Sequence, residues 1–97
     1  MTQVYLERKG GTFLVSCTGH ATGSPEMCAA ISCLIGTLDG WLENSGGCVE
    51  RRVEPGNVLL RFRGGSDCRT AFEMTATGFF RLQATDSAHI SVVFKKI

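Results

Sequence analysis

The pattern over residues 25–43 constrains the fold of this chain most. Apolar side chains recur there at every third or fourth position, at Met27, Ala30, Ile31, Leu34, Ile35, Leu38, Trp41 and Leu42. This spacing places them on one stripe of a helix, and a one-sided stripe has to be buried against another element. Ser24 suits the N-cap, Pro25 the first helical position, and Glu26 the positive end of the helix dipole. The sequence Asn-Ser-Gly-Gly at residues 44–47 ends the helix.

Strand and turn patterns surround this helix. Strands are predicted at residues 4–8, 12–18, 48–54, 58–63 and 89–95. The first two are joined by a Lys-Gly-Gly turn, and the next two surround the turn signal Pro55-Gly56-Asn57. A second helix follows residues 64–67, with apolar positions at Ala71, Phe72, Thr75, Phe79 and Leu82. Gly78 within it costs about 1 kcal/mol against Ala, which indicates close packing against another backbone. The order β-β-α-β-β-α-β predicts a two-layer α/β (α+β) sandwich, in which two helices cover one face of a five-stranded mixed sheet.

Length, charge and hydropathy narrow the class of protein. The chain has 97 residues, 43% of them hydrophobic, which predicts one folded domain over residues 1–97. Its net charge is +1, and acidic residues are interleaved with the arginines, so no direct nucleic-acid contact is expected. No stretch approaches the ~20 apolar residues of a membrane span, and residues 1–8 lack the pattern of a secretory signal. We therefore expect a cytoplasmic protein without a membrane partner.

The five cysteines and two histidines are the candidate reactive side chains. In the cytosol the thiols are expected to be reduced. No pair of cysteines has the Cys-x-x-Cys spacing, so we expect no structural zinc site, and no metal or cofactor is implied. The open question is whether one of the five thiols is reactive. The reactivity of a thiol depends on the charge and the solvent exposure of its surroundings.

Cys28 lies in the first turn of the predicted helix, where it is a candidate nucleophile. Backbone N–H groups at a helix start lack intrahelical partners and the dipole there is positive, so both favour a thiolate and lower the cysteine pKa. His20 follows the strand that ends at Thr18, and the short segment 21–24 keeps that strand end close to the helix start. An imidazole near the sulfur could hold the thiolate as an ion pair and then protonate a leaving amine. Free N–H groups around Met27 and Cys28 could form an oxyanion hole. From spacing alone, a structural role for the histidine and the cysteine remains open.

Other residues compete for these roles. Cys68 is the main rival nucleophile, because it also lies in the first turn of a predicted helix, with His89 as its only other possible base. We expect a structural role for three other cysteines, Cys17, Cys33 and Cys48. Ser32, one turn after the candidate nucleophile, could hydrogen-bond near the site or to its own helix. Glu26 is either a helix-start charge or a supporting acid.

The segments Thr18-Gly19-His20-Ala21 and Cys28-Ala29-Ala30-Ile31-Ser32 resemble the ribosomal-processing cysteine protease family called Prp. That family carries a Gly-His-Ala loop followed by a Cys-Ala-Ala-Val-Ser helix start, and its order of elements and chain length are similar. The resemblance implies a cysteine endopeptidase that removes an N-terminal extension from a large-subunit ribosomal protein during ribosome assembly, or that processes a phage structural protein. It implies a homodimer, with His20 and Cys28 as the catalytic residues. It also implies a flexible substrate-binding loop formed by Gly19, Ala21, Thr22, Gly23 and Ser24.

The chain departs from the family pattern between its two candidate catalytic residues. The loop is shorter by roughly four residues, and Pro25 and Glu26 stand where members usually have an Asp before the cysteine. These changes leave nucleophile and base in place, but Glu26 could replace the Asp only if its side chain turns toward His20. A non-catalytic binding module on the same fold, associated with ribosomes or phage assembly, is therefore the alternative function. A redox-sensing thiol protein is a third hypothesis, and it would need a resolving cysteine near Cys28.

Overall fold

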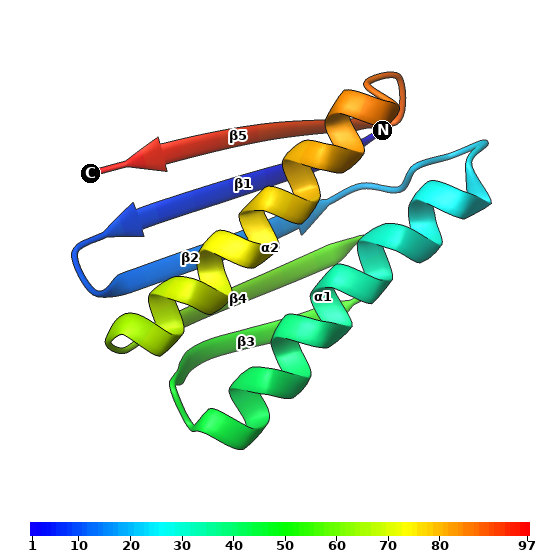
Figure 1. Cartoon of the computed structure of the whole chain (residues 1–97). Coiled ribbons are helices and arrows are strands. Elements are labelled where there is room, and N and C mark those ends of the chain that lie inside the picture. Colours follow the sequence, from blue (N-terminus) through cyan, green and yellow to red (C-terminus); the bar gives the residue numbers. More distant parts are fainter.

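The computed structural model describes residues 1–97 and contains five strands and two helices (Figure 1). In chain order these are β1 (Thr2–Lys9), β2 (Thr12–Thr18), α1 (Pro25–Ser45), β3 (Cys48–Glu54), β4 (Asn57–Arg63), α2 (Ser66–Thr85) and β5 (Ile90–Lys96). The predicted order is confirmed, and the bounds of β2 and β3 are those predicted. α1 continues past Glu43 to Ser45, and α2 begins at Ser66, inside the segment 64–67 that the sequence predicts to precede it.

The five strands form one mixed sheet in the order β3-β4-β2-β1-β5. β1 pairs with β5 in parallel, and the other neighbouring pairs are antiparallel. Figure 1 shows both helices on the same face of this sheet. The predicted two-layer sandwich, with two helices on one face of a five-stranded mixed sheet, is therefore confirmed.

The core lies between the sheet and the helices, and it is built from alternating strand residues. In β2, Phe13, Val15 and Cys17 are buried, while the residues between them point to the other face and are partly exposed. α1 buries the centre of the predicted stripe, through Met27, Ile31, Ile35, Leu38 and Leu42. The ring centroid of Phe13 lies 5.4 Å from that of Phe62 and 5.1 Å from that of Phe72. This aromatic cluster packs α2 onto β2 and β4, because the three rings come from those three elements.

Gly78 lets the two helices approach each other closely. A Cβ at Gly78 would lie 2.7 Å from Cδ2 of Leu34 on α1, a separation that real Cβ atoms essentially never show. The expectation of close packing at Gly78 is right. Its neighbour is a side chain, however, and not the backbone expected from the sequence.

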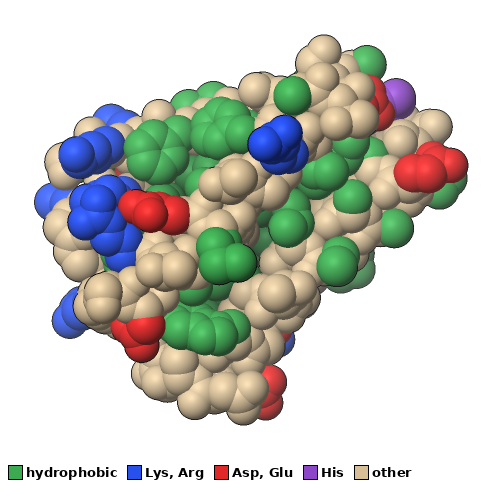
Figure 2. Space-filling model, viewed as in Figure 1, with side chains coloured by type: hydrophobic (Ala, Val, Ile, Leu, Met, Phe, Trp, Pro, Cys, Tyr) green, Lys and Arg blue, Asp and Glu red, His purple; other side chains and the backbone are tan.

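The two ends of the sandwich are formed by different elements and different kinds of side chain. Figure 2 shows hydrophobic side chains between the helices and basic side chains gathered mainly where β1 and β5 finish. At the other end, the start of β1, the end of β2, the start of α1 and the β3–β4 turn lie together (Figure 1). Neither helix is long and apolar enough to cross a membrane.

Candidate active site

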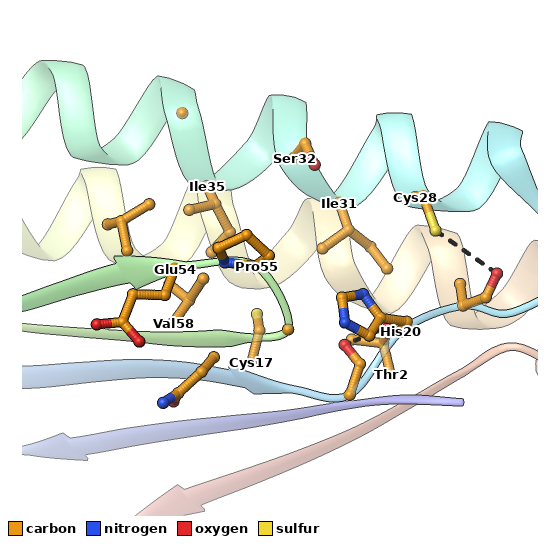
Figure 3. Close-up of a pocket in the computed structure, with 16 residues that line it drawn as sticks. Thr2, Cys17, His20, Cys28, Ile31, Ser32, Ile35, Glu54, Pro55 and Val58 are labelled. Carbon is orange, nitrogen blue, oxygen red and sulfur yellow. Dashed lines mark hydrogen bonds between the residues drawn. The ribbon is translucent and has the colours of Figure 1, made fainter.

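Cys28 lies in the first turn of α1, which begins as the sequence predicts. Ser24 is the N-cap, and its Oγ accepts a hydrogen bond from the Met27 N–H at 3.2 Å. The Cys28 side chain is half-buried, and its Sγ donates a hydrogen bond to the Ala21 carbonyl at 3.5 Å (Figure 3). The thiol is therefore directed back toward the segment that connects β2 to α1.

His20 follows the end of β2, where contacts from two other segments hold the chain. Gly19 has a φ of +84°, and a Cβ there would lie 2.6 Å from the Met1 carbonyl oxygen, so this position requires glycine. The Gly19 N–H donates to the Gly56 carbonyl at 3.0 Å, which ties the end of β2 to the β3–β4 turn. The His20 imidazole lies directly against Gly56.

His20 and Cys28 line one pocket, which has a volume of about 330 Å³. Two further predicted site residues of the β2–α1 loop, Gly19 and Ala21, line it too, as does Ser32 on α1. Apolar side chains from the sheet and α1 form much of the rest, namely Cys17, Ile31, Ile35, Val53, Pro55 and Val58. Figure 3 shows the Cys28 sulfur bonded to the Ala21 carbonyl, and no hydrogen bond joins it to the imidazole. His20 and Cys28 thus share one pocket without a hydrogen bond between them, a geometry that does not exclude catalysis because catalytic hydrogen bonds often form only when substrate is bound.

The remaining predicted site residues lie outside the pocket: Thr22, Gly23, Ser24 and Glu26. Ser24 caps α1, and Gly23 lies beside His89, whose Nε2 is 3.9 Å from where a Cβ would be. Glu26 is exposed and forms no ion pair or hydrogen bond with His20. The carboxylate of Glu26 thus does not take the place of the missing Asp in this arrangement.

The start of α1 has fewer free N–H groups than the sequence suggests. The Met27 N–H is bonded to the Ser24 side chain, and the Cys28 N–H donates to the Ser24 carbonyl at 3.1 Å. Pro25 has no N–H, so the Glu26 N–H is the one first-turn donor without a partner. The expectation of free amides at Met27 and Cys28 is therefore wrong, because the N-cap residue already occupies both.

Cys68, the rival nucleophile, is poorly placed for catalysis. Its side chain is buried, and its Sγ donates to the Arg63 carbonyl at 3.7 Å. Burial, and to a smaller extent the Asp67 carboxylate, raises the pKa of the Cys68 thiol. His89 lies beyond the far end of α2, a 20-residue helix and therefore about 30 Å long. His89 pairs instead with Asp86, with Nδ1 and Oδ2 2.7 Å apart.

The other thiols also differ from Cys28. All five cysteines are free. Cys17 lines the pocket but is buried, and burial raises the pKa of its thiol to about 12. Cys33 and Cys48 are exposed and do not line the pocket. Cys28 is thus the one thiol that lines the pocket without being fully buried. No group of three or more His, Cys, Asp or Glu side chains is placed to hold a metal ion.

The β3–β4 turn is the part of the pocket that sequence patterns do not reveal. Residues 53–58 all line the pocket, although the sequence marks Pro55-Gly56-Asn57 only as a turn. The antiparallel pairing of Thr18 with Asn57 brings this turn to the end of β2. The pairing of β2 with β4 would have revealed that this turn lines the pocket. Local sequence patterns do not specify which strands pair, so the sequence alone does not give it.

The fold is shared with solved structures. The chain is similar to SMU.848 from Streptococcus mutans, with a TM-score of 0.76 and 23% identity, covering 100% of this chain and 96% of that chain. It is similar to the ribosomal processing protease Prp from S. aureus in complex with a covalently linked product peptide (TM-score 0.83, 13% identity, 98% of this chain and 100% of that chain). The same protease in complex with a substrate peptide gives a TM-score of 0.74 and 11% identity, with 98% of this chain and 100% of that chain covered. No family model matches the chain, and no curated protein matches its sequence. The chain therefore has the fold of the Prp protease, as the resemblance implies.

Proposed function

We propose that this chain is a cysteine endopeptidase that removes an N-terminal extension from a large-subunit ribosomal protein. The observation that carries the proposal is the placement of His20 and Cys28 on one pocket, at the end of β2 and the start of α1. Both lie in the segments that resemble the Prp family, and the chain has the fold of a Prp protease solved with peptides. The proposal includes a homodimer in the cytoplasm, where the five free thiols would stay reduced.

In the proposed reaction Cys28 is the nucleophile and His20 is the general base and acid. His20 takes the thiol proton, and the Cys28 thiolate attacks the scissile carbonyl carbon to form a tetrahedral intermediate. The imidazolium then protonates the leaving amine as the carbon–nitrogen bond breaks, which leaves a thioester on Cys28. A water molecule then gives a proton to His20 and attacks the thioester carbon. The carbon–sulfur bond breaks, the acid product leaves, and His20 returns the proton to the Cys28 sulfur.

One rearrangement has to precede this chemistry. The Cys28 thiol is hydrogen-bonded to the Ala21 carbonyl and not to His20. Proton transfer therefore requires the Cys28 side chain to rotate, or the segment at Ala21 to move. A substrate that enters the pocket between α1 and the β3–β4 turn would contact both Cys28 and His20, because both residues line it.

The pocket lining favours an apolar substrate side chain. The pocket is lined by Ile31 and Ile35 from α1 and by Val53 and Val58 from the β3–β4 hairpin. Burial of an apolar group between them contributes about 25 cal/mol per Å². We expect a peptide whose apolar residues next to the cleavage site are replaced by Asp to be cleaved poorly, because a carboxylate would be desolvated there without a partner.

Replacement of Cys28 tests the proposal. Cys28→Ala should lower kcat by at least about 10³-fold for a peptide that matches the ribosomal-protein extension of the same organism, because the nucleophile is lost. Cys68→Ala and Cys33→Ala are the controls and should keep activity, since one thiol is buried away from the pocket and the other is exposed elsewhere on α1. Retained cleavage in Cys28→Ala together with lost cleavage in Cys68→Ala would show that the assignment is wrong.

A non-catalytic binding module on the same fold is the second candidate. The observation that favours it is the Cys28–Ala21 hydrogen bond, which leaves the thiol unpaired with His20. Labelling with iodoacetamide near neutral pH separates the two candidates, because a thiolate of low pKa is alkylated quickly. Labelling dominated by Cys28, ahead of the more exposed Cys33, supports the peptidase. Slow labelling at every site, with Cys28 no faster than Cys33, supports the binding module.

A further inference from the structure

The β3–β4 turn lies directly against the proposed base. Gly56 has a φ of +69°, and a Cβ there would lie 2.5 Å from His20 Nε2, 2.9 Å from Cε1 and 3.1 Å from Cδ2. The imidazole therefore occupies the space that any larger side chain at position 56 would need. The Nε2 corner of the ring faces the turn, since the three nearest ring atoms are Nε2 and its two neighbours.

The same turn also holds the backbone next to the imidazole. The Gly56 carbonyl accepts a hydrogen bond from the Gly19 N–H at 3.0 Å, one residue before His20. On the other side, the hydroxyl of the buried Thr2 donates to the Gly19 carbonyl at 3.5 Å. His20 itself is exposed and makes no side-chain hydrogen bond, so the turn is the contact that limits where its ring can lie.

We propose that Gly56 is a positioning residue for His20: its missing side chain lets the imidazole rest against the β3–β4 turn, on the pocket that it shares with Cys28. This inference rests on the proposed function, because it takes His20 to be the base for Cys28. It goes further in assigning a role to the β3–β4 hairpin, which α1 separates from His20 in the sequence. The lining of the pocket and the orientation of the base would then depend on the same turn.

Gly56→Ala tests this role, and Gly10→Ala is its matched control. Both glycines have a left-handed φ, +69° and +58°, so both substitutions strain the backbone. Gly10 lies in the β1–β2 turn and has nothing within 4 Å of an added Cβ, whereas Gly56 has the His20 ring. The measured quantity is the alkylation rate of Cys28 by iodoacetamide near neutral pH, which does not require a known substrate. Wild type, Gly56→Ala, His20→Ala and the double variant form a cycle that isolates the coupling of positions 20 and 56.

We expect Gly56→Ala to slow alkylation of Cys28 about tenfold, because the displaced imidazole no longer holds the thiolate as an ion pair. Gly10→Ala should leave the rate unchanged. In the His20→Ala background, Gly56→Ala should have no further effect, because the ring that it displaces is gone. Folded stability gives a second measurement. Gly56→Ala should lower the urea midpoint more than Gly10→Ala, and in the His20→Ala background this difference should disappear.

Two results would overturn the role of Gly56. One is a Gly56→Ala variant that alkylates like Gly10→Ala while His20→Ala is slow. The other is a Gly56→Ala effect of the same size with and without His20, which would place the effect in the backbone alone. If His20→Ala itself alkylates as fast as the wild type, the proposed dyad fails, and that failure is recognised without any variant at position 56.

Discussion

Two cysteines line the same pocket, and their surroundings differ. Cys17 belongs to β2 and is only 4% exposed, so it packs as a small apolar side chain. Burial raises the pKa of its thiol to about 12, which keeps it protonated at neutral pH. Cys28 is half-buried in the first turn of α1, with its sulfur hydrogen-bonded to the Ala21 carbonyl. Both thiols contribute to the lining of the pocket, and Cys28 is therefore the candidate nucleophile of the two.

The Cys17 thiol makes stability depend on pH in the alkaline range. Its pKa is about 12 in the folded chain and 9.0 as a free thiol, so the unfolded chain releases a proton that the folded chain retains. The contribution of this thiol to the free energy of unfolding is thus fully present below pH 9 and is lost as the pH rises toward 12. The free energy of unfolding falls over this range by at most about 1.4 kcal/mol per pH unit. Urea unfolding of Cys17→Val should show a shallower fall over this range than the wild type, and Cys33→Ala should not. An unchanged slope in Cys17→Val would contradict the assignment.

The two helix starts show why similar sequence signals lead to different sites. Each helix places a cysteine in its first turn after a Gly- or Ser-containing segment, and the sequence predicts both positions correctly. In α2, however, Asp67 Oδ1 accepts from the Cys68 N–H at 2.8 Å, and the thiol is turned into the core. In α1, the Ser24 side chain caps the helix and Cys28 stays at the pocket. Burial of the one cysteine and not the other depends on packing against the sheet, which helical spacing cannot specify.

The contact between α1 and α2 at Gly78 can be tested against another helical glycine. Gly40 in α1 has nothing within 4 Å of an added Cβ, whereas Gly78 in α2 has Leu34 Cδ2 at 2.7 Å. Gly40→Ala should raise the free energy of unfolding by about 0.5–1 kcal/mol, the ordinary gain in helix propensity. Gly78→Ala should gain less or lose stability, because the Leu34 side chain has to move. Urea unfolding measures both, and adding Leu34→Ala should restore the gain at position 78. Equal gains at the two glycines would show that the helices are not limited by this contact.

At the scale of the molecule, the candidate site is assembled by sheet topology. The element order, the two-layer fold and the positions of His20 and Cys28 follow from patterns within single segments. The wall formed by residues 53–58 does not, because it depends on β4 pairing with β2 across the inserted helix. The N-terminal residues also reach the site only through pairing, since β1 lies between β2 and β5 and places Thr2 beside Gly19. Local pattern thus predicts the candidate reactive residues, while the other walls of their pocket arise from long-range pairing.

The same topology places one wall of the site at an edge of the sheet. β3 is an edge strand, all of its residues are exposed, and its pairing with β4 is irregular between Cys48 and Glu50. β3 is linked to α1 by Arg51, whose Nε and Nη2 donate hydrogen bonds to the Asp39 carboxylate at 2.8 and 2.9 Å. This guanidinium lowers the pKa of the Asp39 carboxyl. Strand opening at such an edge requires less free energy than global unfolding. We therefore expect β3 amides to exchange with solvent faster than those of the central strand β2.

Hydrogen exchange of an Arg51→Ala variant tests whether this ion pair secures the hairpin. Exchange of the β3 amides should rise a few-fold, the size expected for loss of an exposed ion pair, while exchange in β2 stays the same. Arg69→Ala is the matched control, because Arg69 pairs with Glu73 within α2 at 3.0 Å and does not contact β3. If Arg51→Ala and Arg69→Ala give the same β3 exchange, strand pairing alone holds the hairpin. If only Arg51→Ala loosens β3, the hairpin that carries Gly56 is held to the helical layer by the ion pair of Arg51 with Asp39, which lies outside the pocket.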